Sequence, residues 1–118
     1  MKNNTSRLWR RRSQRVTLSM PVVVSEPESN QKQALERTHT LGVNRYGGLI
    51  ALRAAVRWGQ NLRLTNPYTR ESQECRVVYL GPYHRDIQQV GVEFTEPVGN
   101  FWNISFPAPS ARPLAGEA

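Results

Sequence analysis

Apolar residues in this chain recur at every second position over short segments, and turn-forming residues separate those segments. The first segment places five apolar side chains on one side of an extended chain: Val16, Leu18, Met20, Val22 and Val24. A period of two is the spacing of a strand with one buried face, whereas a helix repeats its apolar residues every three or four positions. No stretch of the sequence carries the pattern of a long helix. The sequence therefore predicts an all-β fold.

Six segments are expected to form strands, namely 16–24, 32–43, 49–52, 61–65, 74–80 and 87–94. Pro21 predicts an edge or a bend in the first strand, and Gly81-Pro82 predicts the end of the fifth. Short strands at this spacing, with turns between them, are typical of a small antiparallel barrel or sandwich. The aromatic run 100–106 is expected to plug an open end of the β structure.

The 118 residues suit one domain of ordinary size. We expect a flexible lead-in at 1–9, a β domain at 10–106 and a disordered, proline- and alanine-rich tail at 107–118. The sequence has neither the apolar core of a secretion signal nor the roughly 20 apolar residues of a membrane span. Cys75 is the only cysteine, so we expect a buried thiol, no internal disulfide and a cytoplasmic protein.

Arginines gather just before the first strand, at Arg10, Arg11, Arg12 and Arg15, in a chain of net charge +7. Positive charge this dense beside an ordered element usually has an anionic partner, although it can also serve solubility alone. Arg11 and Arg15 stand four apart, in an R-x-x-x-R spacing. Guanidinium groups bind phosphates through two parallel hydrogen bonds and stack on purine rings, so a phosphate ester of a nucleotide suits this segment.

Catalytic and metal-binding patterns are missing from the sequence. His39 and His84 have no serine, cysteine or carboxylate partner in a known motif, and both are expected to face solvent. Cysteine and histidine do not cluster as metal ligands, and the common glycine-rich phosphate loops do not occur. We therefore expect a binding protein that is not an enzyme and has no cofactor or metal.

A second element, Gly42-Val43-Asn44-Arg45-Tyr46-Gly47, has the form G-x-N-x-x-G and lies in a tight turn between two expected strands. An R-x-x-x-R before the first strand, followed about thirty residues later by a [D/N]-x-S-x-x-G element, resembles the PilZ family. The segment 90–94, Val-Gly-Val-Glu-Phe, is similar to the closing strand of that family. The resemblance covers roughly residues 10 to 96. It implies a six-stranded antiparallel β-barrel that binds the bacterial second messenger cyclic di-GMP.

The resemblance also implies roles for individual residues. Arg11 and Arg15, with Arg10 beside them, would hold the phosphates of the ligand and stack on guanine. Gly42 occupies the position of the family's Asp or Asn, Asn44 occupies that of its Ser, and Gly47 matches outright. A lost hydrogen bond to a ligand is worth about 0.5–1.5 kcal/mol, so two weakened contacts would lower the affinity about tenfold.

Three functions remain open on the sequence alone. The first is a cyclic di-GMP receptor or adaptor in bacterial signalling. The second is a degenerate PilZ module that binds a protein and no nucleotide, because Gly42 and Asn44 depart from the motif. The third is sequence-independent binding of single-stranded nucleic acid through Trp9 and the arginine run. Tyr46 suits either stacking on a ligand or packing over its turn, and Trp58 is expected to be a hydrophobic cap on a turn.

Overall fold

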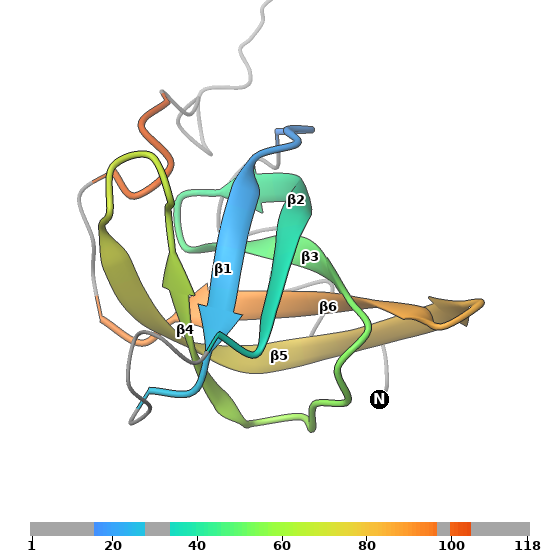
Figure 1. The fold of residues 1–118 in the computed structure, drawn as a ribbon. Helices are drawn as coiled ribbons and strands as arrows, with labels where there is room; N and C mark the ends of the chain where they lie inside the picture. Colours follow the sequence, from blue (N-terminus) through green and yellow to red (C-terminus); the bar gives the residue numbers. More distant parts are fainter. Residues whose placement is uncertain (1–15, 28–33, 97–99, 105–118) are drawn as a thin grey trace, which may run out of the picture.

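The computed structural model describes residues 16–27, 34–96 and 100–104. Within them lie six strands: β1 (Pro21–Ser25), β2 (Glu36–Asn44), β3 (Gly47–Leu52), β4 (Asn61–Thr65), β5 (Ser72–His84) and β6 (Ile87–Phe94). Every pairing is antiparallel, and the strands close into a barrel in the order β1-β2-β3-β6-β5-β4 (Figure 1). The predicted all-β, six-stranded antiparallel barrel is confirmed.

The barrel interior is filled by the apolar residues that alternate along the strands. Val22 and Val24 of β1, Leu62 and Leu64 of β4, and their counterparts on the other strands are fully buried. Cys75 belongs to this core, as predicted, and burial with a contribution from Glu74 raises the pKa of its thiol to about 12. The apolar spacing of two residues in the sequence is therefore the spacing of the barrel's inner wall.

The first predicted strand is too long. β1 begins only at Pro21, and Val16 forms an isolated bridge with Val43 instead of a continuous ladder. Near this segment, the register of β2 against β3 shifts between Thr40 and Gly42. There the Thr40 hydroxyl accepts a hydrogen bond from the Met20 N–H at 2.9 Å and donates one to the Leu18 carbonyl, so a side chain takes the place of regular ladder bonds.

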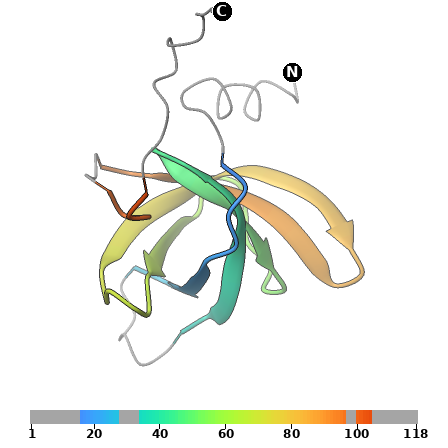
Figure 2. The ribbon, with the colours of Figure 1, turned by 90° about the horizontal axis from the view of Figure 1, so that it is seen from above.

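The predicted end of the fifth strand at Gly81-Pro82 is wrong, because β5 continues to His84. Its register against β6 shifts between Leu80 and Tyr83, and this irregular stretch accommodates the proline. Together β5 and β6 form a long hairpin that projects beyond the barrel, as both views show (Figures 1 and 2). The hairpin turns at Arg85-Asp86, where Arg85 has a φ of 61°.

Two predicted segments, the lead-in at 1–9 and the tail at 107–118, lie outside the described residues. The described part of the domain contains no helix of the length and apolarity required to cross a membrane. His39 and His84 are both exposed, as predicted.

Gly47 is required by the close approach of two strands. A Cβ at this position would lie 1.9 Å from the Val92 carbonyl oxygen on β6, far inside van der Waals contact. A Cβ on the neighbouring Gly48 would lie 3.1 Å from the Trp102 ring. Neither glycine has a positive φ; among the described glycines only Gly59 does, at 87°. The paired glycines therefore permit close packing of β3 against β6 and Trp102.

Gly47→Ala is expected to lower the free energy of unfolding by about 3 kcal/mol or more, because a backbone carbonyl cannot move aside as a side chain can. Gly59→Ala is the matched control, since nothing lies within 4 Å of its Cβ and only the backbone conformation is strained. Its cost should be about 1–2 kcal/mol. Urea denaturation of both variants measures the difference, and equal losses of stability would contradict the role given to the Gly47 contact.

Candidate functional site

The turn between β2 and β3 contains the second sequence motif and is held by its own side chains. The Asn44 amide oxygen accepts a hydrogen bond from the Tyr46 N–H at 2.8 Å, which fixes the two turn residues, Arg45 and Tyr46. Asn44 is fully buried, Tyr46 is half-buried and Arg45 is exposed. This segment, residues 42–47, is called the motif turn below. Its asparagine therefore stabilises the turn through the same oxygen that could accept from a ligand.

Trp102 fastens the motif turn to the end of the barrel. Its indole N–H donates to the carbonyl oxygens of Asn44 and Gly47, each at 3.0 Å. The rings of Phe94, Phe101 and Trp102 pack together with centroids 5.0–5.9 Å apart, and Phe101 and Trp102 are buried. The predicted aromatic plug is confirmed for the described residues 100–104, and its bond to the motif turn is a feature that spacing along the sequence could not indicate.

The N-terminal segment reaches the barrel at the motif turn. Val16 and Val43 exchange backbone hydrogen bonds of 2.7 and 2.8 Å, so Val16 lies beside the residue that precedes Asn44. Arg10, Arg11 and Arg15 lie outside the described residues, as does Trp9. Val16 directly follows Arg15 in the sequence. The described chain thus enters the barrel beside the motif turn, directly after the arginine run in the sequence.

The other predicted site residues serve the architecture of the motif turn. Gly42 is buried and follows the register shift of β2, and it pairs with Leu49 of β3. Gly47 is buried against β6. On the far side of the turn, the Phe94 N–H donates to the Tyr46 carbonyl at 2.7 Å. Among the motif residues in the described chain, only Arg45 and Tyr46 present side-chain surface to solvent.

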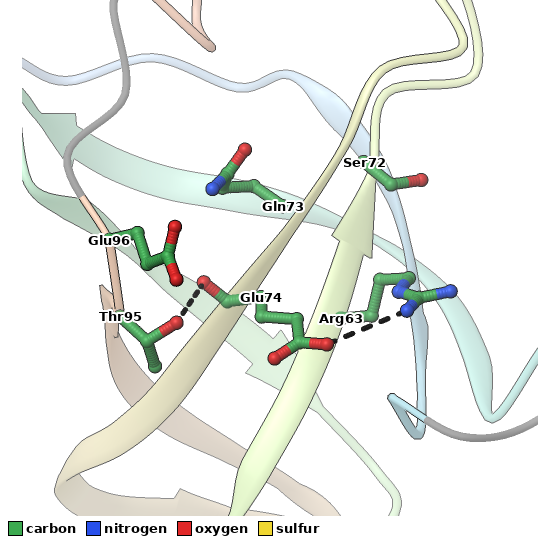
Figure 3. Close-up of a pocket in the computed structure, with 6 residues that line it drawn as sticks. All are labelled: Arg63, Ser72, Gln73, Glu74, Thr95 and Glu96. Atoms are coloured by element: carbon green, nitrogen blue, oxygen red, sulfur yellow. Dashed lines mark hydrogen bonds and ion pairs between the residues drawn. The ribbon is translucent and has the colours of Figure 1, made fainter.

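A separate pocket of about 350 Å³ lies over β4, β5 and the residues that follow β6 (Figure 3). It is lined by Arg63, Ser72, Gln73, Glu74, Thr95 and Glu96. The Arg63 guanidinium lies 3.6 Å from the Glu74 carboxylate, so the one cation of the lining already has an anionic neighbour. Because the lining has two carboxylates and a single guanidinium, this pocket does not suit a phosphate ester.

The described residues contain no group of three or more side chains that could hold a metal ion. Trp58 was predicted to be a hydrophobic cap on its turn, but 64% of its surface is exposed.

Comparisons with known proteins support the fold. No protein-family model matches the chain, and no curated protein matches its sequence. Among solved structures, the barrel is similar to that of the Bacillus subtilis inhibitor of motility, MotI/DgrA, with a TM-score of 0.53 and 17% sequence identity. The match covers 73% of this chain and 43% of that one, so the chain spans less than half of the similar protein. The likeness is one of fold, and it supports the PilZ-like barrel that the motifs predicted.

Trp102→Phe is expected to lower the free energy of unfolding by about 1–3 kcal/mol, because two carbonyl oxygens lose their donor while the ring packing is largely kept. The loss should be local, with faster hydrogen exchange at the amides of Tyr46 and Gly47. Phe101→Leu removes packing but leaves the indole bonds, so it should destabilise the barrel without this local effect. Unchanged exchange in Trp102→Phe would contradict the fastening of the turn by Trp102.

Proposed function

We propose that this chain is a PilZ-like binding module for cyclic di-GMP that acts as a receptor or adaptor in bacterial signalling in the cytoplasm. One observation carries the proposal: the Val16–Val43 bridge brings the residue after the R-x-x-x-R pair to the motif turn. A ligand held there would be reached by the arginines from one side and by the turn from the other. The PilZ-like fold supports the proposal without testing it.

The arginines would supply most of the binding free energy. Arg11 and Arg15 would pair with the phosphodiester groups and stack on guanine, since a guanidinium presents both a donor fork and a flat face. At the motif turn, the amide oxygen of Asn44 is already bonded to Tyr46, and Gly42 offers no side chain. We therefore propose that the affinity for cyclic di-GMP is lowered, because the motif turn offers the ligand fewer side-chain hydrogen bonds.

Isothermal titration of the full chain with cyclic di-GMP should give a measurable binding isotherm. Arg11→Ala and Arg15→Ala should each weaken binding at least tenfold, because a hydrogen bond to a charged group is worth about 1.5–3 kcal/mol. Arg37→Ala is the control, since Arg37 is exposed near the opposite end of β2 from Asn44. If no heat of binding is measured at high micromolar concentrations of protein and cyclic di-GMP, the proposal is wrong.

A second candidate, a degenerate PilZ module that binds a protein and no nucleotide, is favoured by the burial of Asn44 and the engagement of its amide oxygen. If the departures from the motif abolish binding, Gly42→Asp combined with Asn44→Ser should create or strengthen it. The same titration measures the effect, with circular dichroism as the check that the double variant folds. A folded double variant that binds no better than the parent would show that motif decay is not the explanation.

A further inference from the structure

Part of β5 has a free edge. β4 has 5 residues and β5 has 13, and their pairing ends at Asn61 and Arg76. The turn before β4 adds two bonds, from the Gly59 N–H to the Val77 carbonyl and from the Val77 N–H to the Gln60 carbonyl. Beyond this point the segment 78–84 pairs with β6 alone, and no strand of the described chain lies along its other edge. An unpaired edge of this kind is a template for a further strand.

Trp58 stands at the end of that free edge, on a turn that is firmly fixed. The Gln60 N–H donates to the Arg57 carbonyl at 3.0 Å, and the Gln60 side-chain oxygen accepts from the Arg57 N–H at 2.9 Å. Gly59 supplies the positive φ, and it serves only the backbone, because nothing lies within 4 Å of its missing Cβ. The turn therefore fixes the backbone that carries a 64% exposed indole, so binding need not order this part of the backbone.

Exposed apolar side chains continue along the free edge. Leu80 is 37% exposed and Tyr83 is 64% exposed. With Trp58 they are three of the five large hydrophobic residues that the described chain exposes. Aromatic side chains held by rigid elements carry much of the binding energy at protein interfaces. The β5–β6 hairpin projects beyond the barrel (Figure 2). Its segment 78–84 thus has exposed apolar side chains and an edge without a neighbouring strand, although the Gly81 carbonyl already accepts a hydrogen bond from the Gln88 side-chain amide at 3.1 Å.

The residues around this edge carry more positive than negative charge, which favours an acidic binding partner. Arg57, Arg76 and Arg85 surround it, whereas Asp86 is the only carboxylate in 53–60 and 76–89. Arg76 stands opposite Glu93 on β6, so the charge that favours an acidic partner rests chiefly on Arg57 and Arg85. A second copy of the chain suits the edge poorly, because antiparallel pairing of two β5 edges would bring the cations of the hairpin tip of one copy toward Arg76 of the other. Pro82, which has no N–H to donate, also weakens self-pairing.

We propose that the free edge of β5, residues 78–84 with Trp58 at its end, binds an extended acidic peptide segment of a partner protein by strand addition. Backbone hydrogen bonds to β5 would supply the pairing, and alternate apolar side chains of the peptide would contact Trp58, Leu80 and Tyr83. Acidic side chains in or beside that segment would face the arginines. The edge has room for about seven residues, or roughly 23 Å of strand.

The edge lies away from the motif turn. Gly47 begins β3 beside Glu93, and Leu52 ends it beside Gln88, next to the projecting hairpin. Tyr79 of the edge pairs with Gly91 of β6, which pairs with Leu49 of β3, so the edge runs from the level of Leu49 past Leu52. The edge and β3 are two strand spacings apart across the sheet, or roughly 10 Å. The proposal does not rest on nucleotide binding, and each can fail without the other.

The test is a selection of random twelve-residue displayed peptides against the full chain, followed by synthesis of the enriched peptides. Enriched sequences should alternate apolar and polar residues and carry net negative charge. In fluorescence polarisation, Trp58→Ala and Tyr83→Ala should each weaken binding at least tenfold, and Arg76→Glu should weaken it similarly. Tyr68→Ala, which removes an 81% exposed tyrosine from the β4–β5 turn, should leave affinity unchanged. Bound peptide should slow hydrogen exchange of the amides in 78–84.

Three results would overturn the proposal. One is a selection that yields no peptide dependent on Trp58 or Tyr83, and another is protection from exchange that falls outside 78–84. The third is a dimer in light scattering that Tyr83→Ala converts to a monomer, since a second copy would then occupy the edge. Trp58 and Tyr68 lie in turns, Tyr83 lies near the tip of the β5–β6 hairpin, and all three are exposed. Circular dichroism of each variant checks that loss of binding is not loss of fold.

Discussion

The indole N–H of Trp102 bonds two carbonyl oxygens of the motif turn, and the surrounding structure depends on this contact. A buried carbonyl without a donor costs free energy, so the turn and the aromatic plug stabilise one another. The motif turn also fixes the start of β3, where Gly47 lies against the Val92 carbonyl. It also presents Val43 to Val16, which positions the point at which the N-terminal segment meets the barrel. One end of the barrel is thus closed by contacts between segments far apart in the sequence.

Local periodicity made most of the barrel predictable. Strands β4 and β6 have the bounds that alternation indicated, and the number and class of strands agree with the sequence. The failures occur where a long-range contact overrides the local pattern. Residues 16–20 alternate like a strand, yet the Thr40 hydroxyl interrupts the ladder there. Gly81-Pro82 looks like a strand end, yet a strand with a free edge and an irregular register tolerates both residues. Neither effect can be found from neighbouring residues alone.

The candidate site was predicted with mixed results for a related reason. The sequence indicated where the motif turn lies, but not that its residues are engaged in structure. Asn44 caps the turn, and Gly47 is required by the packing of β3 on β6. The barrel needs these residues whether or not a nucleotide binds. Their agreement with a family pattern therefore supports the fold and does not by itself support nucleotide binding. A role specific to the proposed ligand would therefore have to come from Arg11 and Arg15 and from the solvent-accessible side chains of Arg45 and Tyr46.

The arrangement of the strands also bears on whether the two proposed surfaces could influence each other. The motif turn is tied to Val16 and Trp102, both at its own end of the barrel, whereas the free edge of β5 is set by the turn 57–60 and by β6. Between them lie the β3–β6 ladder, which runs from Gly47–Glu93 to Leu52–Gln88 without a shift of register, and the β5–β6 ladder, whose register shifts twice. Coupling between two sites requires an element with two arrangements that both ligands bias. The β3–β6 ladder offers no second register, so coupling of a nucleotide at the motif turn to a peptide at the β5 edge would require a rearrangement of the irregular β5–β6 ladder.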